Sequence, residues 1–198
     1  MAPVAAAVAV VLITAACSGD DPGAQPRTTV PPAPTTTDPY ARPPVIDAAY
    51  LNRVLAALDQ VVGDVVRMMV RDRALTAEAE ERLRAVYADG DAAFTLHRDG
   101  LRQDAKEGVA GARSQPGNQA TTVSKLISVR TDCIFAEVRR DFSAVVDRPD
   151  PEQAVLWVGL KPLDPSRDPK GLNPTPWMYV YDGFPADHTQ PQDPCAGS

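Results

Sequence analysis

The sequence predicts an α+β fold in which two or three N-terminal helices pack on a four-stranded, mostly antiparallel, curved sheet. Between residues 47 and 107 apolar residues recur at helical spacing, whereas after residue 120 they alternate with polar residues as in strands. The chain contains no internal repeat and no alternation of strands with helices. A doubly wound nucleotide-binding fold is therefore not expected.

Three segments have the pattern of amphipathic helices. The first is capped by Asp47, the second by Thr76, and the third extends from about residue 91 to residue 107. In the first segment apolar residues are spaced by four or three positions, which is the period of one helix face. These residues are Leu51, Leu55, Leu58, Val62, Val65 and Met69.

Four later segments have the alternating pattern of strands, and residues typical of turns separate them. Strict alternation places Trp177, Tyr179 and Tyr181 on one face of the last strand. In the first strand it gives one face to Val123, Lys125, Ile127 and Val129. The four predicted strands span residues 123–129, 134–139, 154–161 and 176–181.

Residues 1–17 contain an apolar stretch followed by small residues and carry no charged side chain. This pattern is typical of a secretory signal that is too short to span a membrane. The run Thr14-Ala15-Ala16-Cys17 resembles the lipobox of bacterial lipoproteins, with Thr14 where leucine is usual. The resemblance implies that the Cys17 thiol receives a lipid, which would anchor the chain to the outer face of the cell membrane. The alternatives are a plain secretory signal and a buried apolar helix.

Residues 18–44 form a predicted linker, because eight of the chain's 20 prolines and almost no large apolar side chain lie there. Such a segment cannot bury enough surface to fold, so we expect it to be disordered. At about 3.1 Å per residue it would reach roughly 80 Å when fully extended. The predicted globular domain then covers residues 45–185, and a tail covers residues 186–198.

The composition argues against several partners and cofactors. A net charge of −6 provides no basic field for nucleic acid. Two histidines and three cysteines are little material for a zinc cluster, and the loop 164–173 lacks the terminal glutamate of a calcium loop. We therefore expect no metal, no cofactor and no nucleic acid. The expected partners are the membrane, through the lipid, and an envelope protein, while the oligomeric state stays open.

Two cysteines remain once Cys17 is assigned to the lipid. In an exported chain Cys133 and Cys195 are most simply a disulfide. A redox pair would favour closer spacing and a basic or helix-terminal setting. We therefore expect a structural bond that fastens the C-terminal tail to the second strand.

No sequence motif assigns a catalytic residue. His97 lies beside charged residues in a predicted helix and His188 lies in the polar tail, so neither has an evident nucleophile as partner. The chain has no Gly-x-Ser-x-Gly elbow and no phosphate-binding loop. Among the strand residues, only Glu137 and Asp182 are candidates for the buried carboxylate that an acid–base enzyme needs.

Aromatic residues concentrate in the last two predicted strands. Trp157, Trp177, Tyr179 and Tyr181 either line a concave ligand pocket, with Glu137 as a polar contact, or fill the core between helices and sheet. Core packing is the favoured interpretation because aromatic rings supply large buried areas in small domains.

Helices followed by a curved run of strands with an aromatic last strand resemble the NTF2-like, or cystatin-like, roll. The segments 172–177 and 181–184 resemble a group of secreted actinobacterial lipoproteins, from which no activity follows. We therefore expect a non-catalytic, lipid-anchored extracytoplasmic domain that binds an envelope partner or a small ligand. The alternatives are an enzyme of the NTF2-like isomerase or dehydratase type and a purely structural envelope component.

Overall fold

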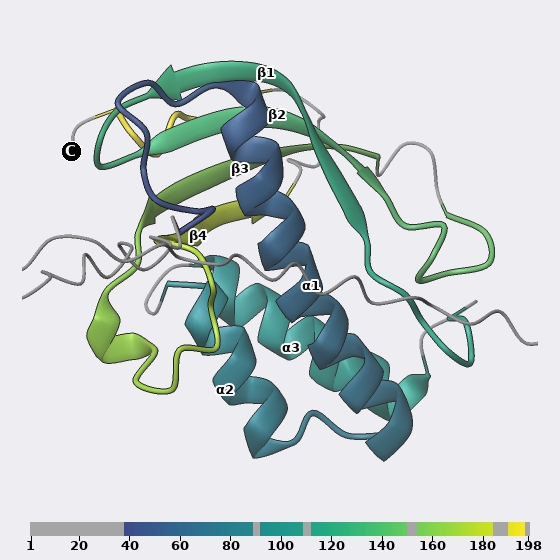
Figure 1. Ribbon diagram of the computed structural model, residues 1–198. Helices are drawn as coiled ribbons and strands as arrows, with labels where there is room; N and C mark the ends of the chain where they lie inside the picture. The colour runs from purple at the N-terminus through teal and green to yellow at the C-terminus, as the bar shows by residue number, and fades with distance from the viewer. Residues whose placement is uncertain (1–37, 89–91, 109–111, 150–153, 184–189, 197–198) are drawn as a thin grey trace, which may run out of the picture. The chain divides into compact units, whose positions relative to one another are not determined.

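The computed structural model describes residues 38–88, 92–108, 112–149, 154–183 and 190–196. Within them three helices pack on a four-stranded antiparallel sheet with the strand order β1-β2-β3-β4, which confirms the α+β class (Figure 1). The helices are α1 (Ala48–Asp72), α2 (Ala77–Val86) and α3 (Ala92–Glu107). The strands are β1 (Ala120–Val129), β2 (Ile134–Asp141), β3 (Val155–Pro162) and β4 (Trp177–Gly183), and the 3-10 helix η2 (Pro165–Arg167) precedes β4.

Local hydrogen bonds explain where the first two helices begin. The Asp47 carboxylate accepts a hydrogen bond from the backbone N–H of Tyr50 at 2.7 Å. The Thr76 hydroxyl accepts one from the backbone N–H of Ala79 at 3.3 Å. Both bonds satisfy N–H groups that have no partner within the helix, and both predicted caps are confirmed.

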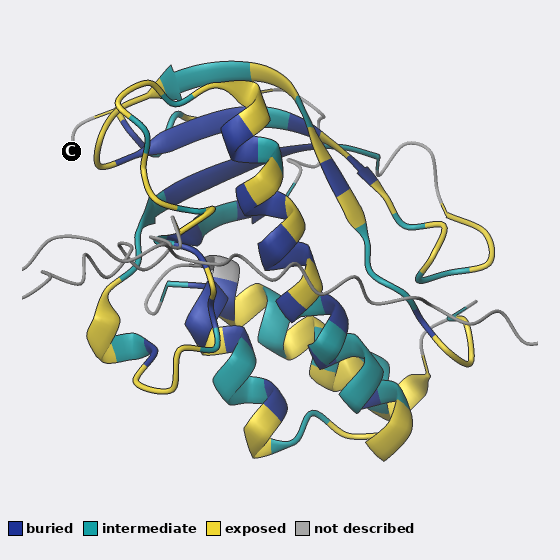
Figure 2. Ribbon diagram, viewed as in Figure 1, coloured by how far each residue is buried: buried dark blue, intermediate teal, exposed yellow. Residues whose placement is uncertain are grey.

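The helices cover one face of the sheet, and the main core lies between the two layers (Figures 1 and 2). Leu51 and Leu55 of α1 lie in this core with Val158 of β3 and Trp177 of β4. A smaller cluster lies on the opposite face of the sheet, which we call the outer face. Its buried members are Cys133, Phe135, Trp157 and Cys195.

A β-bulge in β4 changes which of its side chains face the helices. Between Tyr179 and Tyr181 the pairing advances two residues along β4 but only one along β3, so Val180 is an extra residue. Beyond this point Tyr181 packs against the outer cluster and Asp182 turns toward the helices. The predicted common face of Trp177, Tyr179 and Tyr181 is therefore wrong for Tyr181.

The first strand also departs from strict alternation. Two register shifts interrupt its pairing with β2. As a result, Val123 and Leu126 pack against the main core, whereas Ile127 packs against the outer cluster. The predicted common face of Val123 and Ile127 is wrong, because each extra residue reverses the side to which the following side chains point.

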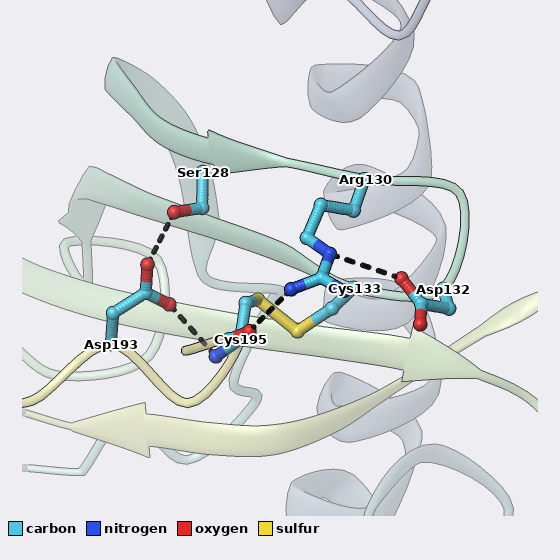
Figure 3. Close-up of a disulfide and its surroundings, with 6 residues drawn as sticks. All are labelled: Ser128, Arg130, Asp132, Cys133, Asp193 and Cys195. Atoms are coloured by element: carbon cyan, nitrogen blue, oxygen red, sulfur yellow. Dashed lines mark hydrogen bonds and ion pairs between the residues drawn. A yellow bond between two sulfur atoms is a disulfide. The ribbon is translucent and has the colours of Figure 1, made fainter. Parts of the chain in front are cut away.

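A disulfide joins Cys133, just before β2, to Cys195 in the C-terminal tail (Figure 3). The two Cα atoms are 5.6 Å apart. Around this bond the Arg130 guanidinium donates to the Cys195 carbonyl at 2.9 Å, and the Ser128 hydroxyl donates to the Asp193 carboxylate. The predicted disulfide is confirmed, and it holds the tail against the outer face.

Residues 38–44 contact the domain, although the predicted linker extends to residue 44. The Arg42 guanidinium lies 4.5 Å from the centroid of the Trp177 ring and donates to two backbone carbonyls at 3.2 Å each. The Tyr50 hydroxyl donates to the Tyr40 carbonyl at 2.9 Å. These contacts begin about five residues ahead of the predicted boundary.

The predicted signal segment with Cys17, the linker residues 18–37 and His188 lie outside the described residues. In the part of the chain that is described, no helix is long and apolar enough to cross a membrane.

Candidate functional site

A cavity of about 400 Å³ lies between the three helices and the sheet. Small-molecule sites occupy roughly 300–1,000 Å³, so this cavity has the size of a ligand site. Its wall is largely apolar and includes Val62, Val66, Leu101, Phe142, Val145 and Leu156.

Polar side chains from four elements meet in the cavity wall around Asp182 of β4. Tyr87 follows α2, His97 belongs to α3 and Arg140 belongs to β2, and each contacts the Asp182 carboxylate. We call these four residues the polar cluster. The bulge at Val180 explains how the carboxylate comes here, because without the extra residue Asp182 would point to the outer face.

Arg140 and Asp182 form a buried ion pair. The Arg140 Nη2 atom lies 2.9 Å from Asp182 Oδ1, and Arg140 Nη1 donates to Oδ2 at 3.2 Å. Only 3% of the Arg140 side chain and 0% of the Asp182 side chain are exposed. The Tyr87 hydroxyl also donates to Oδ2, at 2.7 Å. Each buried charge therefore has a partner of opposite sign and additional hydrogen bonds.

His97 connects this ion pair to the more accessible part of the site. Its Nε2 atom lies 3.4 Å from Asp182 Oδ2 and 3.2 Å from the Asp182 carbonyl oxygen. Both oxygens accept hydrogen bonds, so a neutral His97 carries its hydrogen on Nε2 and leaves Nδ1 as an acceptor. The ring stacks on Tyr87 with centroids 4.5 Å apart, and 30% of the side chain is exposed.

A second buried carboxylate, that of Asp59, is linked to Arg140 through the Thr121 hydroxyl. The Arg140 Nε atom donates to the Thr121 hydroxyl at 2.9 Å, and this hydroxyl donates to Asp59 Oδ1 at 3.0 Å. Asp59 also accepts bonds from the Thr121 backbone N–H at 2.7 Å and from Gln119 Nε2 at 2.8 Å. Gln119 lines the cavity beside Arg140. The network thus runs from α1 through β1 and β2 to the polar cluster.

The surroundings lower the pKa of Asp182 from its ordinary value of 3.8. Burial acts in the opposite direction, but the charges of Arg140 and His97 and the hydrogen bonds from Arg140 and Tyr87 together outweigh it. Burial, followed by the Asp182 charge, raises the pKa of Tyr87 well above its ordinary value of 10.0. Asp182 is therefore a carboxylate near neutral pH, and Tyr87 is a neutral hydrogen-bond donor.

The pKa of Asp59 shifts the other way. Burial raises it above 3.8, and this effect exceeds the lowering by the Arg140 charge and by hydrogen bonds from Gln119 and Thr121. The Arg140 guanidinium stays protonated, because the charges of Asp182 and other neighbours outweigh its burial and raise its pKa. The cavity wall therefore combines a fixed ion pair with a partly exposed histidine. Among the described residues, no group of three or more His, Cys, Asp or Glu side chains could hold a metal ion.

The aromatic residues predicted to line a pocket lie elsewhere. Trp177 and Tyr179 are fully buried in the main core. Trp157 and Tyr181 pack on the outer face beside Cys195 of the tail, and Glu137 pairs with Trp157 across the strands. The wall of the cavity contains none of these aromatic residues, nor Glu137. The helix–sheet core and the bulge in β4 account for this difference.

Sequence reasoning named one candidate carboxylate of the polar cluster and did not predict the cluster. Asp182 was one of two candidate carboxylates, and Arg140 follows the apolar residues of β2 on the face that points to the helices. A charge on such a face is a signal of a buried polar site. His97 gave no such signal, because its partner Asp182 is 85 positions away in the chain.

Comparisons of the chain with protein-family models, curated proteins and solved structures found no match. The resemblances to the NTF2-like roll and to secreted actinobacterial lipoproteins therefore stay predictions. The function proposed for the domain rests on the geometry of the cavity and its polar cluster.

Proposed function

We propose that this chain is a lipid-anchored extracytoplasmic domain that binds a small, mainly apolar ligand in the cavity. The observation that carries the proposal is a cavity of about 400 Å³ with an apolar wall and one organised group of polar side chains. Apolar walls provide affinity, and a few fixed polar groups provide orientation. The lipobox-like run ending in Cys17 supports the anchor.

The apolar lining of the cavity supports a ligand site over an ordinary surface cleft. Other hollows of the described residues have volumes of about 420 to 600 Å³, but their linings are more polar. The polar cluster also contains side chains of α3, β2 and β4 that contact one another at the cavity wall. Holding a buried ion pair at a cavity wall costs desolvation that a filled apolar core would avoid. A binding role provides a reason to keep it.

Binding of N-phenyl-1-naphthylamine, a neutral dye that fluoresces in apolar surroundings, tests the proposal. Val66 lines the cavity, so Val66→Phe fills part of it while Val66→Ala enlarges it. We expect micromolar binding to the natural chain, at least a tenfold loss in Val66→Phe and little loss in Val66→Ala, on the scale of about 1.4 kcal/mol per tenfold change. Equal binding by all three proteins would place the dye elsewhere and contradict the proposal.

A second candidate function is proton transfer to and from a bound ligand, the reaction type of NTF2-like isomerases and dehydratases. Its support is the contact between His97 and Asp182, because a carboxylate that fixes the tautomer and ring position of a histidine favours general-base action. His97 Nδ1 would take a proton from carbon beside a ligand carbonyl and return one from solvent.

Exchange of hydrogen for deuterium beside the carbonyl of a bound ketone, followed by NMR in D₂O, tests this second function. 2-Acetylnaphthalene is a suitable probe. We expect faster exchange with the natural protein than without protein, and loss of that acceleration in His97→Gln. Thr95→Ala is the matched control, because Thr95 is an exposed residue of the same helix. Exchange that His97→Gln leaves unchanged would exclude the histidine as the base.

A further inference from the structure

We infer that the ligand's polar group is a hydrogen-bond donor, a hydroxyl above all, and that anionic ligands such as fatty acids are excluded. The inference rests on the proposed function and deepens it by naming the ligand class. It follows from the charges and from the hydrogen-bond directions around the cavity.

Among the described residues that line the cavity, Arg140 is the one permanently charged cation, and it is already paired. The positive charge of Arg140 is paired with Asp182 at 2.9 Å. Asp59 adds a second carboxylate behind Thr121 and Gln119. One guanidinium and two carboxylates give an excess of one negative charge when His97 is neutral. A ligand carboxylate that entered the cavity would lose its hydration and be repelled by this excess negative charge. The free energy of its burial would therefore be strongly unfavourable.

The three nitrogen atoms of the Arg140 guanidinium already have partners within the protein. Its Nε atom donates to the Thr121 hydroxyl at 2.9 Å, and its two terminal nitrogens face the two oxygens of Asp182. A ligand carboxylate could take over Arg140 only by breaking this paired arrangement. That exchange would leave Asp182 as an unpaired buried charge, which is strongly unfavourable.

The polar atoms left for a ligand are acceptors. Asp182 receives the Nε2–H of His97, so the second ring nitrogen, Nδ1, accepts. Gln119 points its amide nitrogen at Asp59, and its carbonyl oxygen is an acceptor as well. Within the described residues, neither acceptor has a hydrogen bond from the protein. Both side chains line the cavity, so a donating group on the ligand would satisfy one of them.

Four ligands that share one apolar body test the inference. They are 1-naphthalenemethanol, its methyl ether, 1-naphthoate and 1-naphthylmethylammonium, measured at pH 8 by displacement of the dye and by calorimetry. At this pH the carboxylate and the ammonium are both charged. We expect the alcohol to bind about threefold to tenfold more tightly than the methyl ether, as one neutral hydrogen bond provides. We expect naphthoate to bind more than about thirtyfold more weakly than the alcohol, and more weakly than the ammonium.

The variant His97→Phe keeps an aromatic ring against Tyr87 and removes the acceptor. We expect it to reduce the advantage of the alcohol over the ether to less than twofold, while Thr95→Ala keeps the full advantage. If naphthoate binds as tightly as the alcohol, or if the ether equals the alcohol in the natural protein, the inference is overturned while the cavity remains a binding site. If neither the dye nor any of the four compounds binds, the proposed function fails as well.

Discussion

Arg140 Nη2 lies 2.9 Å from Asp182 Oδ1 at the wall of an apolar cavity, and both side chains are withdrawn from solvent. The pair exists because the bulge at Val180 turns Asp182 toward the helices. The same carboxylate holds Tyr87 and His97. The stability of the fold and the proposed ligand binding therefore both involve this ion pair.

Asp182→Asn should destabilise the protein by about 3–5 kcal/mol, because Arg140 would remain as a buried, uncompensated charge. Urea denaturation measures this loss. The double variant Arg140→Met, Asp182→Leu should lose less than the two single changes combined, since it removes both charges together. Asp99→Asn, which breaks the exposed pair with Arg98, is the control and should have no measurable effect. Additive losses in the double variant would show that the two residues are not coupled.

The stabilisation by Asp182 should depend on pH in a defined direction. Its pKa is lowered in the folded protein, so its contribution is complete above the unfolded value near 3.8 and is lost as the pH falls through the folded value. The difference in unfolding free energy between the natural protein and Asp182→Asn should therefore shrink as the pH falls below about pH 4. A difference that stays unchanged or grows below about pH 4 would contradict the assigned charge state.

Asp59 should show the opposite dependence. Burial raises its pKa, so its contribution is complete below about pH 3.8 and declines as the pH rises through the folded value. Asp59→Asn should therefore gain stability relative to the natural protein between pH 4 and pH 7. Urea titrations at several pH values measure both carboxylates in one series. Parallel curves for the natural protein and Asp59→Asn would show that the Asp59 pKa is not raised.

The disulfide between Cys133 and Cys195 should stabilise the fold without being required for it. The double variant Cys133→Ser, Cys195→Ser should retain its circular dichroism spectrum and lose at most about 4 kcal/mol, the chain-entropy value for a loop of this length. Hydrogen bonds of Asp193 with Ser128 and of Arg130 with the Cys195 carbonyl also hold the tail. An unfolded double variant would show that the outer cluster cannot form without the bond.

Membrane attachment should depend on Cys17. The change Cys17→Ser removes the thiol that the lipobox-like run presents, so the protein should appear in the medium or keep its signal segment. Partitioning into detergent, followed by mass spectrometry of the N-terminus, distinguishes these results. Unchanged partitioning of the variant would refute the lipid anchor.

Periodicity and capping residues predicted the order and approximate bounds of the elements. Asp47 and Thr76 begin their helices as expected because a capping hydrogen bond is local. The faces of β1 and β4 could not be predicted, since a bulge depends on pairing with the neighbouring strand. The extra residue at Val180 places Tyr181 on the outer face and turns Asp182 toward the helices.

The candidate site was harder to predict than the fold for the same reason. Its polar cluster joins residues that are far apart in the chain, and no local motif connects His97 to Asp182. Arg140 on the core-facing side of β2 is the sequence feature that could have indicated the site, but it was not singled out. No feature of the sequence predicted the cavity, because the cavity depends on how the helices pack against the sheet.

Intermolecular NOEs between bound N-phenyl-1-naphthylamine and the methyl groups of the ¹³C-labelled protein would locate the ligand within the fold. Ligand binding in the cavity should give NOEs to the methyl groups of Val66, Leu101 and Leu156, which line it, and these NOEs should be lost in Val66→Phe. NOEs confined to Ile127 of the outer face, with none to the three cavity residues, would contradict it.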